Sequence, residues 1–167
     1  ETGIVDNGYA NVIISGITTG KIVDYGVKDS MNMGACMAPA AADLIEANYK
    51  DFEVTQGYYD MIITGDLGYT GKEILLTLLK EKGIDISDIY TDCGIEVFDK
   101  NEQDTQSGGS GCGCSAIVLD TLVLDKLRKR ELKRVLFVPT GALLSQVSFN
   151  EGKSIPGIAH GVVLEAV

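Results

Sequence analysis

The chain has 167 residues, of which 45% are hydrophobic and 23% are charged, and this composition excludes disordered and collagen-like proteins. Its 24 acidic and 14 basic residues give a net charge of −10, which predicts repulsion of nucleic acids and other polyanions. We expect a single domain over residues 1–167, with no signal peptide and no apolar run of the roughly 20 residues that cross a bilayer. Because the chain begins with Glu1 rather than Met, we expect either a processed product or a piece of a longer protein.

The first part of the chain predicts strands followed by a helix. Residues 12–14 and 21–27 are rich in β-branched side chains, and the glycines between positions 16 and 20 indicate two strands or one strand with a bulge. Apolar residues then recur at helical spacing over 35–49. Pro39 is expected in the first turn of this helix, where its missing N–H costs nothing.

The middle of the chain predicts a buried strand, a helix and a short strand. Residues 60–65 form a continuous apolar run, which is typical of a parallel strand buried on both faces. Helical spacing follows over 71–82, with Gly83 in the position of a C-terminal cap. Residues 89–91 are a further strand candidate, and the polar residues 99–106 indicate an exposed loop.

The last part of the chain contains a glycine-rich stretch that leads into a helix. Residues 107–115 precede the helical pattern of 116–129. Residues 134–138 predict a buried strand that ends at 139–141, and 160–167 predict a closing strand after a long connection. Alternating strands and helices favour an α/β fold with βαβ units, a mixed or mostly parallel sheet, and helices on both faces.

The glycine-rich stretch is the first candidate site. Glycines let the backbone approach a ligand closely, and N–H groups at the start of the following helix attract a carboxylate or phosphate. The stretch has neither the GxGxxG register of a dinucleotide site nor the Lys of a P-loop. It therefore predicts either a site for an anion or polar ligand, or a close structural approach of the helix to the sheet.

Two of the four cysteines, Cys112 and Cys114, lie in this stretch, and the other two are Cys36 and Cys93. A chain of this size has core enough without disulfides, so reduced thiols are expected. The CxC spacing matches neither a metal site nor a redox CxxC motif. Cys114 near a predicted helix N-terminus is either a reactive thiol of lowered pKa or a small residue packed in the core.

Three other features have a functional and a structural interpretation. Asp66 follows a predicted buried strand, at the sheet edge where ligands bind in α/β folds, but it also suits a turn or an N-cap. His160 is the only histidine, so it is either a structural residue or a catalytic base. A basic cluster at a predicted helix C-terminus offsets the helix dipole or binds an anionic membrane or protein partner. The cluster comprises Lys126, Arg128, Lys129, Arg130, Lys133 and Arg134.

From about residue 12 to the C-terminus, the chain resembles the stage V sporulation protein AD family of spore-forming bacteria. The stretches that carry the resemblance are 31–43 (MNMGACMAPAAAD), 60–68 (DMIITGDLG), 108–116 (GGSGCGCSA), 138–145 (VPTGALLS) and 154–160 (SIPGIAH). That family is related to thiolases and β-ketoacyl synthases, which consist of two similar βαβαβ halves. The resemblance implies a thiolase-like α/β fold, with this chain as the C-terminal half: one βαβαβ unit with a mixed sheet flanked by helices.

The resemblance also bears on catalysis. In condensing enzymes of that superfamily, the second half supplies a His after its central strand and a His or Asn in a glycine-containing loop. By order along the chain, residues 64–66 and 110–114 stand at these positions, and neither stretch contains His or Asn. Because those groups stabilise the oxyanion of the condensation, the resemblance implies a protein that is not an enzyme. The alternative is an acyl-transferring or condensing enzyme that uses Cys112 or Cys114.

The function that the resemblance implies is binding of dipicolinic acid, pyridine-2,6-dicarboxylate, and its uptake into the developing spore. The resemblance also implies other stage V A sporulation proteins as partners, peripheral association with the inner membrane of the spore or forespore, and a homodimer. It does not imply binding of nucleic acid. No cofactor is expected, and Ca²⁺ is expected only together with dipicolinate. The expected ligand-binding residues are Asp66, Ser110, Gly111, Cys112, Gly113, Cys114, Ser115, Thr140 and Gly141.

Overall fold

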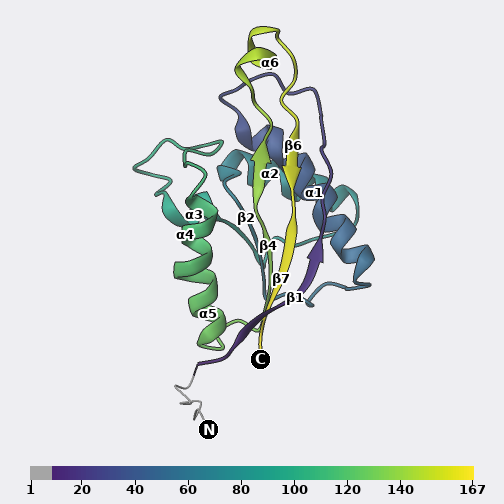
Figure 1. The fold of residues 1–167 in the computed structure, drawn as a ribbon, viewed down its shortest axis with the longest axis vertical. Coiled ribbons are helices and arrows are strands. Elements are labelled where there is room, and N and C mark those ends of the chain that lie inside the picture. Colours follow the sequence, from purple (N-terminus) through teal and green to yellow (C-terminus); the bar gives the residue numbers. More distant parts are fainter. Residues whose placement is uncertain (1–8) are drawn as a thin grey trace.

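The computed structural model describes residues 9–167, which contain a five-stranded sheet in the order β1-β7-β4-β2-β3 (Figure 1). Residues 1–8 of the predicted domain lie outside the described residues. β2 pairs in parallel with β3 and β4, whereas β7 is antiparallel to β4 and β1, so the sheet is mixed. The strands are β1 (Val12–Thr18), β2 (Met61–Thr64), β3 (Tyr90–Asp92), β4 (Arg134–Val138) and β7 (Gly161–Ala166).

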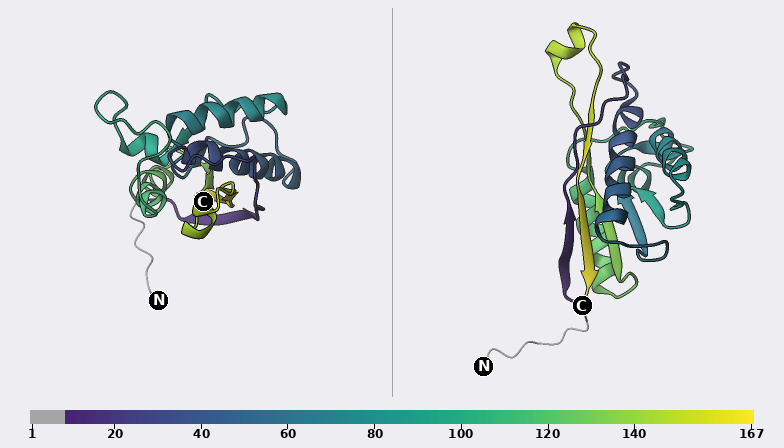
Figure 2. Two further views of the ribbon diagram at one scale, coloured as in Figure 1. Left: turned by 90° about the horizontal axis from the view of Figure 1, so that it is seen from above. Right: turned by 90° about the vertical axis from the view of Figure 1, so that its right-hand side faces the viewer.

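Helices cover both faces of the sheet, which confirms the predicted α/β architecture (Figure 2). One layer contains α1 (Met33–Asp51) and α2 (Gly68–Glu81). The other contains α3 (Cys93–Val97) and a continuous helical run of α4 (Cys114–Val118), the π-helical η1 (Leu119–Val123) and α5 (Leu124–Arg128). None of the helices within residues 9–167 is long and apolar enough to cross a membrane.

The central strands divide their side chains between two cores. Ile62 of β2 and Leu136 of β4 face the core under α1 and α2, whereas the next residues, Ile63 and Phe137, face the core under α4 and α5. This alternation is the period of a strand with both faces buried, and it explains the continuous apolar runs in the sequence. The predicted strands at 60–65, 89–91, 134–138 and 160–167 are therefore confirmed to within two residues at each end.

Helix α1 begins earlier than the periodicity predicts. Asn32 is its N-cap, and the Asn32 Oδ1 atom accepts a hydrogen bond of 3.2 Å from the Ala35 amide. Because the helix starts at Met33, Pro39 lies in the second turn and not in the first, where it was expected. The C-terminus of α2 is as predicted: Gly83 has φ +76°, and the Ile84 amide donates to the Leu79 carbonyl at 2.9 Å.

Strand β1 is a single strand with a bulge, which is one of the two predicted arrangements. Its register with β7 shifts between Ile14 and Gly16. The predicted strand at 21–27 is wrong, because only Val23 forms a bridge there, with Gly157. A β-branched composition favours an extended chain, and the segment does run beside residues 155–157, where the Ile155 amide donates to the Val27 carbonyl at 2.7 Å, but these contacts do not form a continuous ladder.

A hairpin arm projects beyond one end of the sheet (Figures 1 and 2). It consists of β5 (Thr140–Ala142), α6 (Gln146–Asn150) and β6 (Gly157–Ala159), and β5 pairs with β6 antiparallel. The sequence predicts only a chain break at 139–141 and a long connection here. Strands of three residues are too short to show a period, so their pairing is set by contacts distant in sequence.

Candidate functional site

A pocket of about 290 Å³ lies where β2 and β4 end, and residues from both helical layers line it. In parallel strands this edge is the usual place for ligands. All predicted site residues except Gly113 line the pocket, although they come from three separate segments. Its lining consists of Met33, Met37, Asp66, Gly108, Ser110, Gly111, Cys112, Cys114, Ser115, Thr140, Gly141 and Ala142.

Asp66 anchors the glycine loop, by which we mean residues 107–113. The Asp66 Oδ2 atom accepts hydrogen bonds from the Gly109 amide at 3.0 Å, from the Ser110 amide at 2.7 Å and from the Ser110 hydroxyl. The Oδ1 atom is buried and has no hydrogen-bond partner among the described residues, and a Cβ at position 94 would lie only 1.9 Å from it. Asp66 thus lines the pocket and also has the turn-type structural role that the sequence left open.

Asp92 holds the residues that directly follow Asp66 in the chain, and the sequence patterns did not identify this role of Asp92. Its fully buried carboxylate accepts hydrogen bonds from the Thr64 hydroxyl at 2.6 Å and from the Leu67, Gly68 and Gly94 amides at 2.9, 3.2 and 3.1 Å. Burial raises the pKa of this carboxyl group to about 6. The signal in the sequence was an aspartate directly after a short strand, which is also how Asp66 was found.

Gly65 has no side chain, and two hydroxyl groups from the pocket lining occupy the space beside it. A Cβ at this position would lie 2.7 Å from the Thr140 Oγ1 atom and 3.2 Å from the Ser115 Oγ atom. Any side chain at position 65 would therefore collide with Thr140. The Thr140 Oγ1 atom is buried and has no hydrogen-bond partner within residues 9–167, and Thr140 is part of the pocket lining.

The helical run that begins with α4 starts beside the pocket, at Cys114 and not at 116 as predicted. Its N-cap is Gly113, and no side chain caps it. A Cβ at Gly111 or Gly113 would meet no atom within 4 Å, so the end of the glycine loop is open. The Cys114 amide already donates to the Gly111 carbonyl at 3.2 Å, so the first-turn donors that correspond to the predicted anion site are the Ser115 and Ala116 amides.

The cysteines differ sharply in their surroundings. All four are free thiols, and only Cys112 is exposed. Burial raises the pKa of Cys114, and the nearby carboxylates of Asp66 and Asp92 raise it further. The interpretation of Cys114 as a thiol of lowered pKa is therefore wrong, because burial outweighs its place at the helix start.

Neither the histidine nor the basic cluster lines the pocket. The exposed His160 accepts a hydrogen bond of 3.2 Å at Nδ1 from the Gly20 amide, in keeping with the structural interpretation. Within the basic cluster, Lys129 pairs with Asp125 at 2.7 Å, and Arg134 pairs with Glu165 at 2.5 Å. These contacts tie part of the cluster to the chain's own carboxylates.

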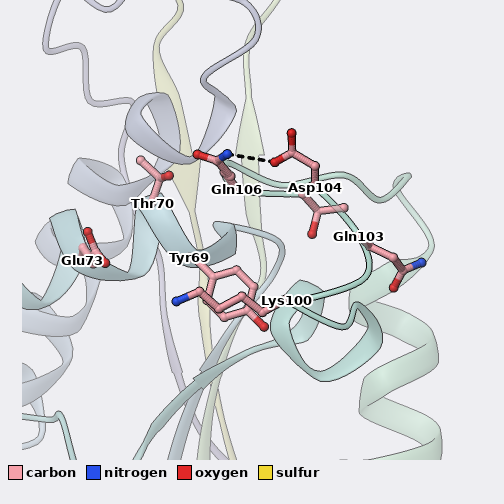
Figure 3. A pocket seen from close by; sticks show the side chains of 8 residues that line it. Tyr69, Thr70, Glu73, Lys100, Gln103, Asp104 and Gln106 are labelled. Carbon is pink, nitrogen blue, oxygen red and sulfur yellow. Dashed lines mark hydrogen bonds between the residues drawn. The ribbon is translucent and has the colours of Figure 1, made fainter.

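A second pocket of about 330 Å³ lies between the start of α2 and the predicted polar loop 99–106 (Figure 3). The Lys100 Nζ atom lies 4.9 Å from the ring centroid of Tyr69, and the Gln106 Nε2 atom donates to Asp104 at 2.8 Å. These polar groups already bind one another, and no predicted site residue lies here. We therefore place the candidate site in the pocket beside the glycine loop.

Comparison with known proteins agrees with the resemblance found in the sequence. The family model described as Stage V sporulation protein AD matches residues 2–165. Stage V sporulation protein AD of Bacillus subtilis (strain 168) is 41% identical over 162 residues, which are 97% of this chain and 48% of that protein. The chain thus spans about half the length of this curated relative. The match over almost the whole chain shows that it belongs to the stage V sporulation protein AD family.

Proposed function

We propose that the pocket binds dipicolinic acid and that the chain is a ligand-binding part of a sporulation protein. The observation that carries the proposal is the meeting of the Ser115 hydroxyl, the unpartnered Thr140 hydroxyl and the uncapped start of α4 at one pocket. These groups donate hydrogen bonds without carrying charge, which suits the carboxylates of a small ligand. The pocket volume is also at the small end for ligand sites, which hold roughly 300–1,000 Å³.

The charge of the site limits the form in which such a ligand binds. Among the residues that the structure describes, Asp66 is the one charged residue in the pocket lining, and the whole chain carries −10. A bare dianion is therefore repelled, and Ca²⁺ bound to the dicarboxylate relieves the repulsion. Calcium takes six to eight oxygen ligands, whereas this lining has one carboxylate, whose Oδ2 atom already accepts three hydrogen bonds. In this proposal Ca²⁺ arrives as part of the ligand and is not held by the chain alone.

The close contacts at Gly65 support a role other than catalysis. The resemblance to condensing enzymes puts a basic residue within 64–66, but Thr140 and Ser115 occupy the space that a side chain at position 65 needs. The sequence 110–114 provides no imidazole or side-chain amide on the other side. We infer that the chain is the C-terminal half of a thiolase-like protein without condensing activity.

The wider role follows from the family. We propose that the full-length protein assists uptake of dipicolinate into the forespore, next to other stage V A sporulation proteins at the inner membrane. Peripheral association and a homodimer belong to the same proposal. The mixed sheet with helices on both faces, in a chain about half as long as its relative, supports the assignment to one half of a two-half protein.

Calorimetry on the full-length protein tests the ligand. We expect dipicolinate, with and without Ca²⁺, to bind with one site per chain and a Gly111→Val variant to lose at least tenfold in affinity, because the valine enters the open pocket. Gly113→Val is the matched control, since position 113 is equally open but does not line the pocket. An absence of binding by the wild type, or equal losses in both variants, would contradict the proposal.

A specific observation keeps an acyl-transferring enzyme as the second candidate. Cys112 is an exposed thiol in the pocket lining. An acyl-CoA analogue with an electrophilic acyl group would then label Cys112 in a time-dependent way, and Cys112→Ser would abolish the labelling. Mass spectrometry of the intact protein distinguishes the candidates: time-dependent labelling supports the enzyme, whereas absence of labelling beside saturable dipicolinate binding in calorimetry supports the binding function.

A further inference from the structure

We propose that Met33 and Met37 form a wall of the pocket that favours a flat ring over an open-chain dicarboxylate. The inference rests on the proposed function, because it assigns the part of the same site that holds the ring. Met37 belongs to the core under α1 and α2, and Met33 and Ala142 pack against that core. The glycine loop and the start of α4 line the pocket from the other helical layer. The pocket therefore has one apolar wall and one polar wall.

The glycine loop holds Met33 in place from both sides. The Ser107 hydroxyl donates to the Asn32 side chain, and the Gly34 amide donates to the Ser107 carbonyl at 3.0 Å. Met33 lies between these two residues, so its backbone is fixed relative to the loop that forms the polar wall. The apolar and polar walls are thus connected by hydrogen bonds at their edge.

Met37 is held by packing. It is 8% exposed, and β6 lies so close to α1 that a Cβ at Gly157 would be 3.0 Å from the Met37 Cα atom and 2.4 Å from the Cys36 carbonyl oxygen. Met33 and Met37 are one turn apart on α1, so their side chains share a face with Cβ atoms roughly 5–6 Å apart. This spacing is about the width of one six-membered ring.

The two walls suit a ligand with a flat apolar face and polar groups at its rim. Thioether sulfur makes favourable contacts with aromatic rings, at about 5 Å, that an aliphatic chain cannot make. With its ring against the methionines, pyridine-2,6-dicarboxylate directs carboxylates toward Ser115, Thr140 and the amides at the start of α4. An open-chain dicarboxylate reaches the same donors but loses the ring contacts and must also give up internal rotations.

The test compares two ligands on the full-length protein by calorimetry. The probes are dipicolinate and glutarate, whose carboxylates are separated by the same number of chain atoms. We expect Met33→Ala to weaken dipicolinate about three- to tenfold and glutarate by less than twofold. Met37→Leu keeps the volume of a core residue while removing the sulfur, so it repeats the test if Met33→Ala fails to fold. Met31→Ala is the control, because Met31 is 84% exposed and does not line the pocket.

Each outcome has a separate meaning. A selective loss of dipicolinate affinity in the Met33 or Met37 variant supports the methionine wall. Equal losses for both ligands, or no loss in either variant, overturn it while the proposed function stands. A wild-type protein that binds neither dicarboxylate overturns the proposed function, and the methionine wall with it.

Discussion

At the scale of single residues, two neighbouring carboxylates have different tasks. Asp66 holds the glycine loop from the rim of the pocket, whereas Asp92 lies fully buried and holds the end of β2 and the start of α2. Asp92 accepts hydrogen bonds from four donors, but burial dominates its pKa, which rises from an ordinary 3.8 to about 6. The shape of the pocket edge therefore depends on a group that titrates in mildly acidic solution.

The raised pKa of Asp92 predicts a pH-dependent stability. The folded state holds this proton more tightly than the unfolded state, so ionisation between about pH 4 and pH 6 lowers the free energy of unfolding by up to about 3 kcal/mol. We expect the free energy of unfolding of the wild type to fall by this amount, relative to that of an Asp92→Asn variant, as pH rises through that window. Above the window the difference should not change further. Chemical denaturation at a series of pH values measures the difference. A carboxyl titration of Asp92 by NMR with its midpoint at 4 or below would contradict the prediction.

At the scale of elements, the crossing of α1 and α2 sets the geometry of the site. Gly34 and Gly71 meet where the helices are closest, and a Cβ at Gly34 would lie 2.3 Å from the Leu67 carbonyl oxygen. Leu67 directly follows Asp66, so the same contact places the first turn of α1, with Met33, beside the pocket. Sequence periodicity identified both helices but not their crossing, because close approach depends on which glycines face each other.

Gly71→Ala tests this crossing. Alanine in a helix is normally more favourable than glycine by about 0.5–1 kcal/mol. Here its Cβ would lie 2.7 Å from the Leu67 Cβ atom and 2.9 Å from the Gly34 Cα atom, so overpacking of about 1–3 kcal/mol outweighs the helical preference. We expect a net loss of thermal stability, measured by calorimetric or circular dichroism melting. Gly113→Ala, where a Cβ meets nothing within 4 Å, provides the control and should melt like the wild type.

At the scale of the whole molecule, β1 forms an edge of the sheet, and this edge exposes apolar side chains. Ile14 and Ile17 are 62% and 65% exposed, and within residues 9–167 β1 pairs on one side only, with β7. An exposed edge strand with apolar side chains readily pairs with another chain. We expect the 167-residue chain by itself to self-associate, and Ile14→Lys with Ile17→Lys to shift it toward monomer in light scattering after size exclusion. Val147→Lys, on the exposed arm, should leave the association unchanged; a wild-type monomer at high concentration would refute the prediction.

The sequence predicted best what depends on local pattern. Buried strands such as 134–138 have continuous apolar runs, and the segments around 66, 110–115 and 140 follow strands or precede a helix, so the sheet topology brings them to one edge. The features that the sequence did not predict depend on contacts between residues that are far apart in the chain. Met33 lines the pocket because Ser107 binds its neighbours, and the strands of the arm exist because β5 meets β6. The hydrophobic periodicity within either segment therefore does not predict those pairings.

Gly65 has a consequence for how this sequence can change over generations. A histidine there collides with the Thr140 hydroxyl, and its Cβ would also lie 3.2 Å from the Ser115 Oγ atom, so replacing Gly65 alone forces the surrounding residues to shift. At least one of the crowding neighbours must first be replaced by a smaller residue, and that replacement removes a hydroxyl group from the pocket lining. Under the proposed function, selection for ligand binding therefore blocks the shortest mutational path to a new base at this position.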